Sequence, residues 1–538
     1  MQTKILFTVL FLFPYLLCGQ SDTILYRIVL NDKGNSQYSL DNPNQFLSQK
    51  SIDRRLKQGF ALDETDLPID TNYFSILKSM GAEIYAHSKW VATIVVSVPN
   101  ENVLNTVQEL PWVKEIYPVY DSKGIDHSIK LCPDTIPEQN FLVAPYSFSS
   151  SQWQVDFTNG LFLHSLGYKG EGISIAVMDT DFIYIDLMDN VFNPDRIKEV
   201  KNFTHTDHDP LRCGIGHGTV VTSVMLAHKD GVFIGTSPEA DYYLFQTEIN
   251  YNYFNPISED YWVAALEYAD SIGIDIASTS LGFSRLDDTT DRYTADQLDG
   301  WYVLASRAAS MAARKGMVLC IAAGNKGKYG TSAPADAFDI LAVGGTNVDS
   351  THNGASSYQT LVDGRIKPDV ATSFSAVVCG YAQGMGQFVI GGFNIGTSFS
   401  CPIIAGLTAC LWGAFPELTS LEIMDLIKST AHLANSPDTL LGYGIPNFML
   451  AYNTVSSIKD NFSDEFNPII IDYVHHLISI LGDDIFDDSR LVIYDILGQE
   501  ILATQYQYAI DISNLQRGVY IAIYTNNSKN YHKLFIRK

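Results

Sequence analysis

Positive charge is scarce in this sequence. Lysine and arginine together number 35, against 60 aspartates and glutamates, which gives a formal net charge of −25 at pH 7. A protein that binds the phosphate backbone of nucleic acids needs clustered basic side chains, so we expect no nucleic-acid partner. The acidic balance instead suits a soluble protein that works outside the cytoplasm.

Long apolar segments are also missing. Residues 5–17 form a mainly apolar stretch of 13 residues, which is too short to span a bilayer comfortably. Lys4 precedes this stretch and Cys18-Gly19-Gln20 follows it, an order typical of a secretory signal peptide and its cleavage site. A lipid anchor on Cys18 is disfavoured because the preceding Leu17 is bulky. We predict a signal peptide over residues 1–20 and no transmembrane span in the mature chain.

Cysteine is rare, with seven residues in the chain. Loss of Cys18 with the signal peptide leaves six, and six cysteines allow 15 pairings that the sequence cannot distinguish. Cys401 and Cys410 lie about 13 Å apart along a predicted helix. A disulfide needs Cα atoms within about 7 Å, so we expect these two thiols to be reduced and buried.

The chain is long for a single core. Its 538 residues, 46% of them apolar and 18% charged, predict two or three folded units. Residues 21–121 predict a small α+β unit with the ferredoxin-like order β-α-β-β-α-β. Its expected strands are 24–30, 83–86, 92–98 and 113–119, and its expected helices are 44–59, 73–80 and 102–110. Residues 122–151 are rich in proline and serine and predict a loop-rich linker and candidate cleavage region.

The central unit, residues 152–455, alternates apolar strands with helices. This alternation predicts an α/β fold with a parallel sheet covered by helices on both faces. The expected strands are 173–178, 242–245, 274–279, 317–322 and 340–343, and the expected helices are 220–226, 261–272 and 301–314. Active sites of such sheets lie at the carboxyl ends of the strands.

The last part of the chain changes character. Residues 456–467 are polar and acidic and predict a linker. Residues 468–538 contain short strands, expected at 491–494, 508–512, 520–524 and 531–536, and predict a small all-β sandwich.

Two polar residues lie next to predicted elements of the central unit, Asp179 after a strand and His217 before a helix. Asp179 comes directly after strand 173–178, where a carboxylate can orient a histidine base. His217 stands between Gly216 and Gly218, which leave its ring accessible. Taken alone, the aspartate is an ordinary turn residue and the histidine an ordinary surface or core group.

Two further segments suit peptide recognition. Asn325 follows strand 317–322 and the turn Ala323-Gly324, and its amide can donate to an oxyanion. Ser280-Leu281-Gly282 follows strand 274–279, and a glycine at a strand edge lets an extended peptide lie alongside.

Ser398 completes this set. The segment Gly396-Thr397-Ser398-Phe399-Ser400-Cys401-Pro402 precedes an apolar stretch, and a helix beginning near Ser400 places Pro402 in its first turn. A serine at the positive end of a helix is either an N-cap or a nucleophile. The chain order Asp, His, Ser favours the nucleophile because it is the order of subtilisin rather than of the α/β-hydrolases.

The central unit resembles the subtilisin-like serine proteases. The matching motifs are Ala176-Val177-Met178-Asp179-Thr180, Gly216-His217-Gly218-Thr219, Ser280-Leu281-Gly282, Ala322-Ala323-Gly324-Asn325, Gly364-Arg365-Ile366-Lys367-Pro368-Asp369-Val370 and Gly396-Thr397-Ser398-Phe399-Ser400-Cys401-Pro402. The resemblance implies a serine endopeptidase that hydrolyses peptide bonds through an acyl-enzyme. Its triad would be Asp179, His217 and Ser398, with Asn325 in the oxyanion hole. Ser280, Leu281, Gly282, Ala323 and Gly324 would line the substrate cleft.

Two positions depart from the family pattern. Asp181 replaces the usual glycine after the Asp-Thr pair, and Val220 replaces a usual second histidine. We expect little effect from Val220. Asp181 brings a second carboxylate next to the triad, which could raise a neighbouring pKa or distort the turn. It keeps open the alternative of a catalytically inactive subtilisin fold that acts as a surface binding protein.

The flanking units carry resemblances of their own. Residues 21–121 resemble an inhibitor-type propeptide of the same family. The C-terminal unit resembles the sorting domains of the type IX secretion system of certain Gram-negative bacteria, on Leu491-Val492-Ile493-Tyr494-Asp495, Leu497-Gly498-Gln499, Gly518-Val519-Tyr520 and the basic end 533–538. This implies export through the periplasm to the cell surface or medium, with the outer-membrane secretion machinery as partner. A carbohydrate- or matrix-binding sandwich is the alternative.

Metal ligands are not grouped in a recognisable motif. His205-Thr206-Asp207-His208-Asp209 has no zinc spacing with a second half. The acidic residues 483–488 lack the glycine and terminal glutamate of an EF-hand. We expect no required cofactor; the resemblance allows structural calcium with no ligands assigned.

Overall fold

A computed structural model describes most of the chain. The described residues are 23–122, 132, 136–143, 147–248, 256–283, 293–459, 469–472, 477–480, 489–495, 499–505, 509–516, 518–526 and 529–537. The predicted signal peptide and most of the predicted linker 456–467 lie outside these residues.

The N-terminal module, residues 23–122, is the predicted ferredoxin-like unit. Its antiparallel sheet has the order β2-β3-β1-β4, from β1 (Ile24–Leu30), β2 (Glu83–Ser88), β3 (Thr93–Ser97) and β4 (Val113–Asp121). Helices α2 (Thr71–Ser79) and α3 (Glu101–Gln108) lie near the expected positions. The expected helix 44–59 is instead a short 3₁₀ turn followed by α1 (Gln49–Gln58). The break occurs because Ser48 caps α1 by accepting a hydrogen bond from the Ser51 N–H.

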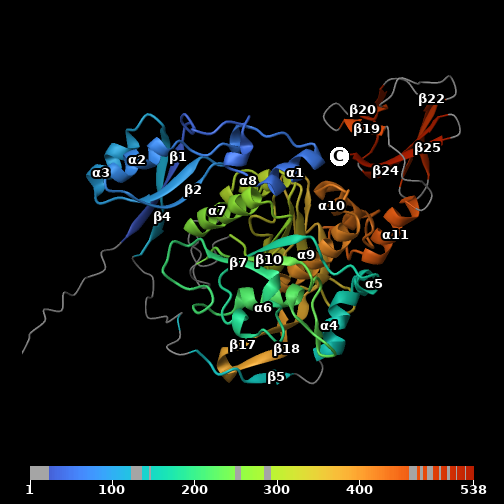
Figure 1. Cartoon of the computed structure of the whole chain (residues 1–538), viewed down its shortest axis with the longest axis horizontal. Helices are drawn as coiled ribbons and strands as arrows, with labels where there is room; N and C mark the ends of the chain where they lie inside the picture. Colours follow the sequence, from blue (N-terminus) through green and yellow to red (C-terminus); the bar gives the residue numbers. More distant parts are fainter. Residues whose placement is uncertain are drawn as a thin grey trace, which may run out of the picture.

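The central unit is built on a seven-stranded parallel sheet of order β16-β13-β12-β11-β6-β10-β7. The strands are β6 (Ser174–Asp179), β7 (Ile197–Asn202), β10 (Asp241–Gln246), β11 (Ile276–Thr279), β12 (Val318–Ala322), β13 (Leu341–Thr346) and β16 (Val370–Ser373). Helices α6 (His217–Leu226) and α9 (Thr397–Ala414) pack on one face, and α7 (Ile257–Ile272) and α8 (Leu304–Arg314) pack on the other. The predicted α/β fold is therefore confirmed (Figure 1).

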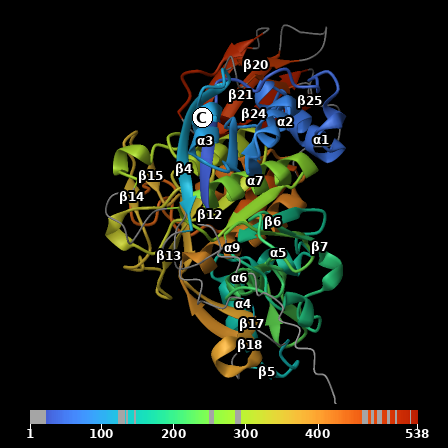
Figure 2. The same cartoon turned by 90° about the vertical axis from the view of Figure 1, so that its left-hand side faces the viewer.

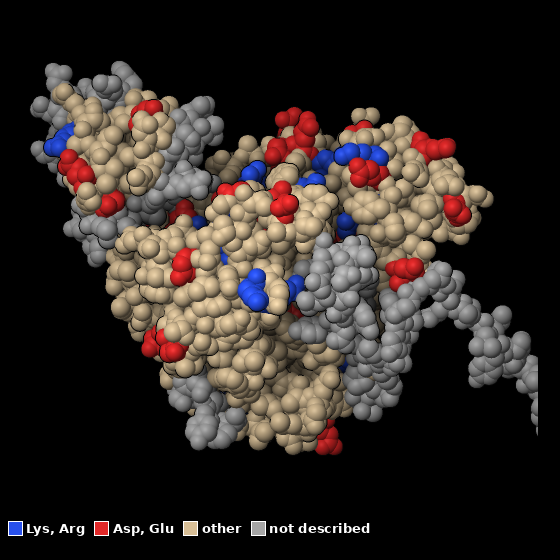
Figure 3. All heavy atoms as spheres, turned by 180° about the vertical axis from the view of Figure 1, so that it is seen from behind, with Lys and Arg blue, Asp and Glu red and all other residues tan. Residues whose placement is uncertain are grey.

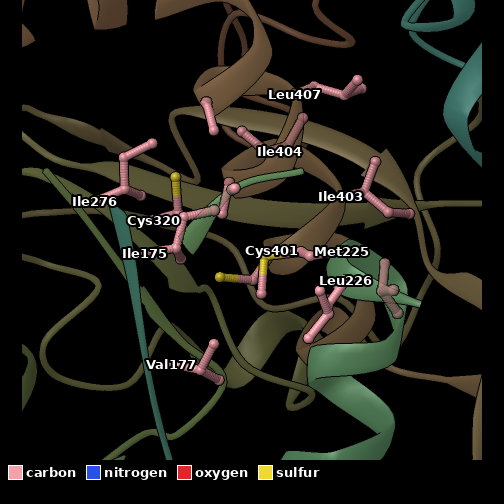
Figure 4. Packing of buried hydrophobic residues seen from close by; sticks show 14 of the residues in the cluster. Ile175, Val177, Met225, Leu226, Ile276, Cys320, Cys401, Ile403, Ile404 and Leu407 are labelled. Carbon is pink, nitrogen blue, oxygen red and sulfur yellow. The ribbon is translucent and has the colours of Figure 1, made fainter. Parts of the chain in front are cut away.

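The core between the sheet and α9 is mainly apolar. Figure 4 shows Ile175, Ile276 and Cys320 of the sheet facing the α9 residues Cys401 and Ile404. Cys401 and Cys410 are buried free thiols, as expected, and burial raises the pKa of Cys401 to about 12. Helix α9 is apolar and long enough to cross a membrane, but 89% of its residues are buried, as in the central helix of a protein core.

The elements of the central unit that were not predicted from the sequence include four strands. Strand β7 is rich in charged residues because it lies at the sheet edge, and β16 has only four residues. A long hairpin of β17 (Ser375–Ala382) and β18 (Gln387–Ile395) leads directly into the Ser398 segment. Its glycine pair, Gly391-Gly392, obscured the strand pattern.

The predicted linker 122–151 is more structured than expected. Strand β5 (Phe141–Val143) pairs in parallel with β18, and Phe141 stacks on Phe388. Helix α4 (Ser147–Asp156) also begins inside the linker range. Cys132 forms a disulfide with Cys213. Hence Cys132 is attached to the central unit by its disulfide, and β5 by pairing with a strand far away in sequence.

The C-terminal unit has two small antiparallel sheets around one apolar core. The first contains β19 (Ile469–Asp472), β20 (Leu477–Ile480) and β23 (Ile510–Asp511). The second contains β22 (Glu500–Gln505), β21 (Arg490–Asp495), β24 (Gly518–Asn526) and β25 (Lys529–Arg537), in that order. Ahead of it, α11 (Phe448–Lys459) extends into the range predicted as a linker.

The N-terminal module lies against helices α7 and α8 (Figures 1 and 2). Buried charged groups contribute to this contact alongside apolar side chains. Arg27 of β1 donates to Asp260, and the backbone N–H groups of Lys89 and Trp90 donate to Glu267. Helix α1 reaches the opposite end of α7, where both Arg54 and Arg55 bind Asp270. These three acidic residues of α7 are all buried, so the module and the helix satisfy each other's charges.

Candidate active site

Asp179 and His217 meet at the carboxyl end of β6. The His217 Nδ1 lies 2.7 Å from the Asp179 Oδ1, and the Asp179 side chain is fully buried. The Thr180 backbone N–H donates to the same carboxylate oxygen at 2.8 Å. Because Nδ1–H is held by a carboxylate, the other ring nitrogen, Nε2, is left as the basic atom.

The charges around His217 favour its protonated form. Burial lowers the pKa of His217, but the charge and hydrogen bond of Asp179 outweigh it, with further contributions from Asp181 and Glu248, so the net pKa is raised. Burial, and then the Asp179 charge, raise the pKa of Glu248 to about 8. Glu248 was missed in the sequence because it follows β10 without any recognisable motif.

Ser398 lies in the first turn of α9, not ahead of it as predicted. The helix begins at Thr397, directly after Gly396, whose φ of 136° favours glycine. Pro402 is consequently inside the helix and cannot donate to the Ser398 carbonyl oxygen four residues earlier. The Ser280 hydroxyl donates to that oxygen instead, at 2.7 Å. The structure therefore accommodates the proline by bringing the β11 loop against the nucleophile segment.

The Ser398 hydroxyl faces two of the predicted site elements. It donates to the Ser280 carbonyl oxygen at 3.3 Å, and its neighbour Phe399 lies 6.2 Å, centroid to centroid, from the His217 ring. Ser398 is 8% exposed, so its surroundings exclude most water. The structure thus brings the serine and histidine segments together at the carboxyl end of the parallel sheet.

The side-chain amide of Asn325 has a fixed orientation. Its Oδ1 accepts hydrogen bonds from the Thr397 N–H at 2.9 Å and the Thr397 hydroxyl at 3.0 Å. A backbone N–H can only donate, so the oxygen must face Thr397 and the Nδ2 group must face away from it. A Cβ atom at Gly396 would lie 3.3 Å from that Nδ2. The amide donor is therefore held beside the backbone that precedes Ser398. The contact with Thr397 that holds it was not predicted from the sequence motifs.

Both predicted substrate segments contact the segment that holds the nucleophile, through Ser280 and Gly324. Gly282 is exposed while Leu281 is buried, and a Cβ atom at Gly282 would lie 2.8 Å from the Ser332 Cβ. Ala323 is buried and Gly324 is partly exposed, with its N–H donating to the Thr397 hydroxyl at 3.2 Å. All the predicted site residues thus gather at the carboxyl end of the parallel sheet. No group of three or more potential metal ligands occurs among the described residues.

Comparison with known families assigns all three units. The model described as "Subtilase family" matches residues 170–444, just over half of the chain. The chain belongs to the subtilase family. A second model, "Peptidase S8 propeptide domain, Bacteroidota", matches residues 25–129, and a third, "Secretion system C-terminal sorting domain", matches residues 475–538. The family resemblances predicted for the central unit and both flanking units are confirmed.

Curated relatives are similar only at modest identity. Subtilisin amylosacchariticus of Bacillus subtilis subsp. amylosacchariticus is 28% identical over 51% of this chain and 64% of its own length. Alkaline elastase YaB of Bacillus sp. (strain YaB) is 26% identical over 55% of this chain and 68% of its own. Subtilisin-like protease SBT6.1 of Arabidopsis thaliana is 26% identical over 57% of this chain. This chain spans 28% of the SBT6.1 length and 64% of the first subtilisin.

One solved structure is similar at a low level. The crystal structure of MycP1 from Mycobacterium smegmatis matches 60% of this chain and 90% of its own, with a TM-score of 0.45 and 19% sequence identity.

Proposed function

We propose that this subtilase is an exported serine endopeptidase made as a precursor. The observation that carries the proposal is the 2.7 Å contact between His217 Nδ1 and Asp179 Oδ1. This contact lies at the carboxyl end of the sheet, where Ser398 also lies. A buried carboxylate that fixes the tautomer of a histidine beside a serine is the arrangement that nucleophilic acyl transfer requires.

In the proposed reaction, His217 Nε2 takes the proton of the Ser398 hydroxyl as its oxygen attacks the peptide carbonyl carbon. The tetrahedral oxyanion accepts hydrogen bonds from Asn325 Nδ2 and the Ser398 N–H, at the positive end of α9. His217 then gives its proton to the leaving amine, which leaves an acyl-enzyme that water hydrolyses. Asp179 stabilises the imidazolium throughout. The exposed backbone of Gly282 and Gly324 would hold the peptide substrate.

The competing function is an inactive surface binding protein. Incubating the processed protein with a mixed peptide library, and sequencing the products by mass spectrometry, separates the two. We expect new termini from the wild-type protein and none from Ser398→Ala. A folded, processed wild-type protein that cuts no peptide in the library would favour the binding protein.

The N-terminal module is proposed to act as the propeptide. Ser122 still belongs to this module, since its N–H donates to the Thr23 carbonyl oxygen, whereas Cys132 is bonded to Cys213 of the central unit. We therefore place the maturation cut between Ser122 and Cys132, inside the broader range predicted from sequence. N-terminal sequencing of the active enzyme tests this: a start at residue 123–132 is expected. A mature chain that begins near residue 21, or beyond Cys132, would contradict it.

The C-terminal unit is proposed to direct type IX export across the outer membrane and to take no part in peptide cleavage. Its match to a sorting-domain model supports this role. Deleting residues 468–538 should leave an active protease trapped in the periplasm. Normal appearance of the truncated protein outside the cell would overturn the sorting role. Every catalytic step is assigned to protein groups, so we propose that no cofactor is required; chelator treatment would then affect stability alone.

A further inference from the structure

Asp181 is a buried carboxylate with an unusual set of partners. It replaces the glycine that the subtilisin-like pattern has at this position, and it is only 1% exposed. Within its own loop it accepts hydrogen bonds from the Thr180 hydroxyl at 2.9 Å and the Ile183 N–H at 3.3 Å. From the loop before His217 it accepts the N–H groups of Ile215 at 3.0 Å and Gly216 at 2.8 Å. Burial raises the pKa of Asp181, and the hydrogen bonds it accepts oppose that rise. All four partners donate, which suits an ionised carboxylate.

The loop before His217 is shaped around this side chain. Gly214 has a φ of 148°, and a Cβ atom there would lie 2.2 Å from the Asp181 Cγ. Gly216 has a φ of 86° and immediately precedes His217, the first residue of α6. Glycine at position 214 therefore makes room for the carboxylate, and the positive φ of both glycines lets the N–H groups of Ile215 and Gly216 turn toward it.

Asp179 and Asp181 thus hold the same histidine from the same strand end. Asp179 binds the imidazole ring, and Asp181 binds the backbone directly before it. We propose that Asp181 is a positioning residue that fixes the backbone of the general base His217 and stabilises its imidazolium through its negative charge. The inference rests on the proposed function, since it assigns His217 the role of base.

The charge effect can be separated from the packing effect. Three carboxyl groups act on His217, those of Asp179, Asp181 and Glu248, and each of them raises its pKa. The base works only when neutral, so activity falls as the pH drops through that raised pKa. Asp181→Asn keeps the size of the side chain and removes one negative charge, so the acid limb of kcat/KM should move to lower pH.

The experiment compares matured wild-type enzyme with Asp181→Asn and Asp181→Gly. We expect kcat to fall on the order of 10- to 100-fold with KM little changed, because a displaced base acts mainly in the transition state. The acid limb should shift downward in both variants. The same shift should appear when the His217 ring is titrated by NMR in a Ser398→Ala background, which needs no activity.

Asp186 provides a matched control. It also joins the two loops, through Arg212 at 2.8 and 2.7 Å, but this pair is partly exposed and does not contribute to the pKa of His217. Asp186→Asn should leave kcat and the acid limb unchanged. If the Asp181 variants lose only thermal stability, or if neither folds, Asp181 is a structural residue and the inference is wrong. An inactive wild-type enzyme would instead overturn the proposed function and leave the NMR arm to decide the positioning role.

Discussion

At the scale of single residues, the orientation of the Asn325 amide decides whether this residue can act as an oxyanion donor or only shapes a turn. Asn325 could be placed beside the nucleophile from its motif, but the direction of its donor could not. That direction follows from Thr397, which binds the amide oxygen with both its N–H and its hydroxyl. An amide so fixed meets the acceptor in the transition state without having to reorganise.

The first prediction concerns this amide. Asn325→Leu should lower kcat by roughly 10²- to 10³-fold while KM changes little, because that is the usual cost of removing one hydrogen-bond donor from an oxyanion hole. Steady-state kinetics on the folded variant measure it. If Asn325 only shapes the turn, the variant should instead melt earlier and keep the kcat of its folded fraction.

Residue identities were more predictable than residue partners. The positions of Asp179, His217 and Ser398 follow from short motifs, because their chemistry needs those types at strand and helix ends. The N–H groups of Ile215 and Gly216 that bind Asp181, and the carboxyl group of Glu248, come from segments distant in sequence. Such contacts depend on tertiary packing, which a single sequence read locally does not encode.

At the scale of elements, the start of α9 shows how a helix boundary can be misjudged. We expected a helix beginning near Ser400 with Pro402 in its first turn, whereas the helix begins at Thr397, five residues before the proline. The cost of an interior proline is offset here by the Ser280 hydroxyl, which takes the place of the missing N–H at the Ser398 carbonyl oxygen. Likewise, β5 was hidden in a proline- and serine-rich stretch because its partner β18 lies far along the chain. By contrast, the buried strands β6, β11 and β12 were recognised from their mainly apolar sequences.

A double-mutant cycle tests this substitution of one donor for another. In a Ser398→Ala background, Ser280→Ala should destabilise the protein by about 1–3 kcal/mol, because a buried carbonyl loses its donor. Pro402→Ala restores a backbone N–H at that position, so Ser280→Ala should cost clearly less when both changes are combined. Thermal unfolding of the single and double variants gives the comparison. Strictly additive effects would show that the hydroxyl and the proline are unrelated.

At the scale of the whole molecule, charge is distributed unevenly between surface and interface. Figure 3 shows acidic and basic side chains scattered over one face without a continuous basic patch. Several ion pairs are instead buried between the N-terminal module and α7. Breaking a buried pair leaves an uncompensated charge, whereas exposed pairs contribute little.

Helix α1 allows the two cases to be compared within one element. Arg54, with its side chain 4% exposed, pairs with the buried Asp270, while Lys50, 49% exposed, pairs with Asp275. Arg54→Ala should destabilise the Ser398→Ala precursor by about 3 kcal/mol. Lys50→Ala should cost less than about 1 kcal/mol. Denaturant unfolding of both precursors decides it, and equal losses would mean that the buried pair does not hold the module in place.

The central claim is that Ser398 is a nucleophile activated by His217 and Asp179. The most direct measurement is reaction of the processed protein with a serine-directed phosphonylating reagent, followed by peptide mapping. The account predicts a single modified residue, Ser398, with modification lost in Ser398→Ala and strongly slowed in His217→Ala. A folded, processed protein that remains unmodified, or one modified equally well without His217, would contradict it.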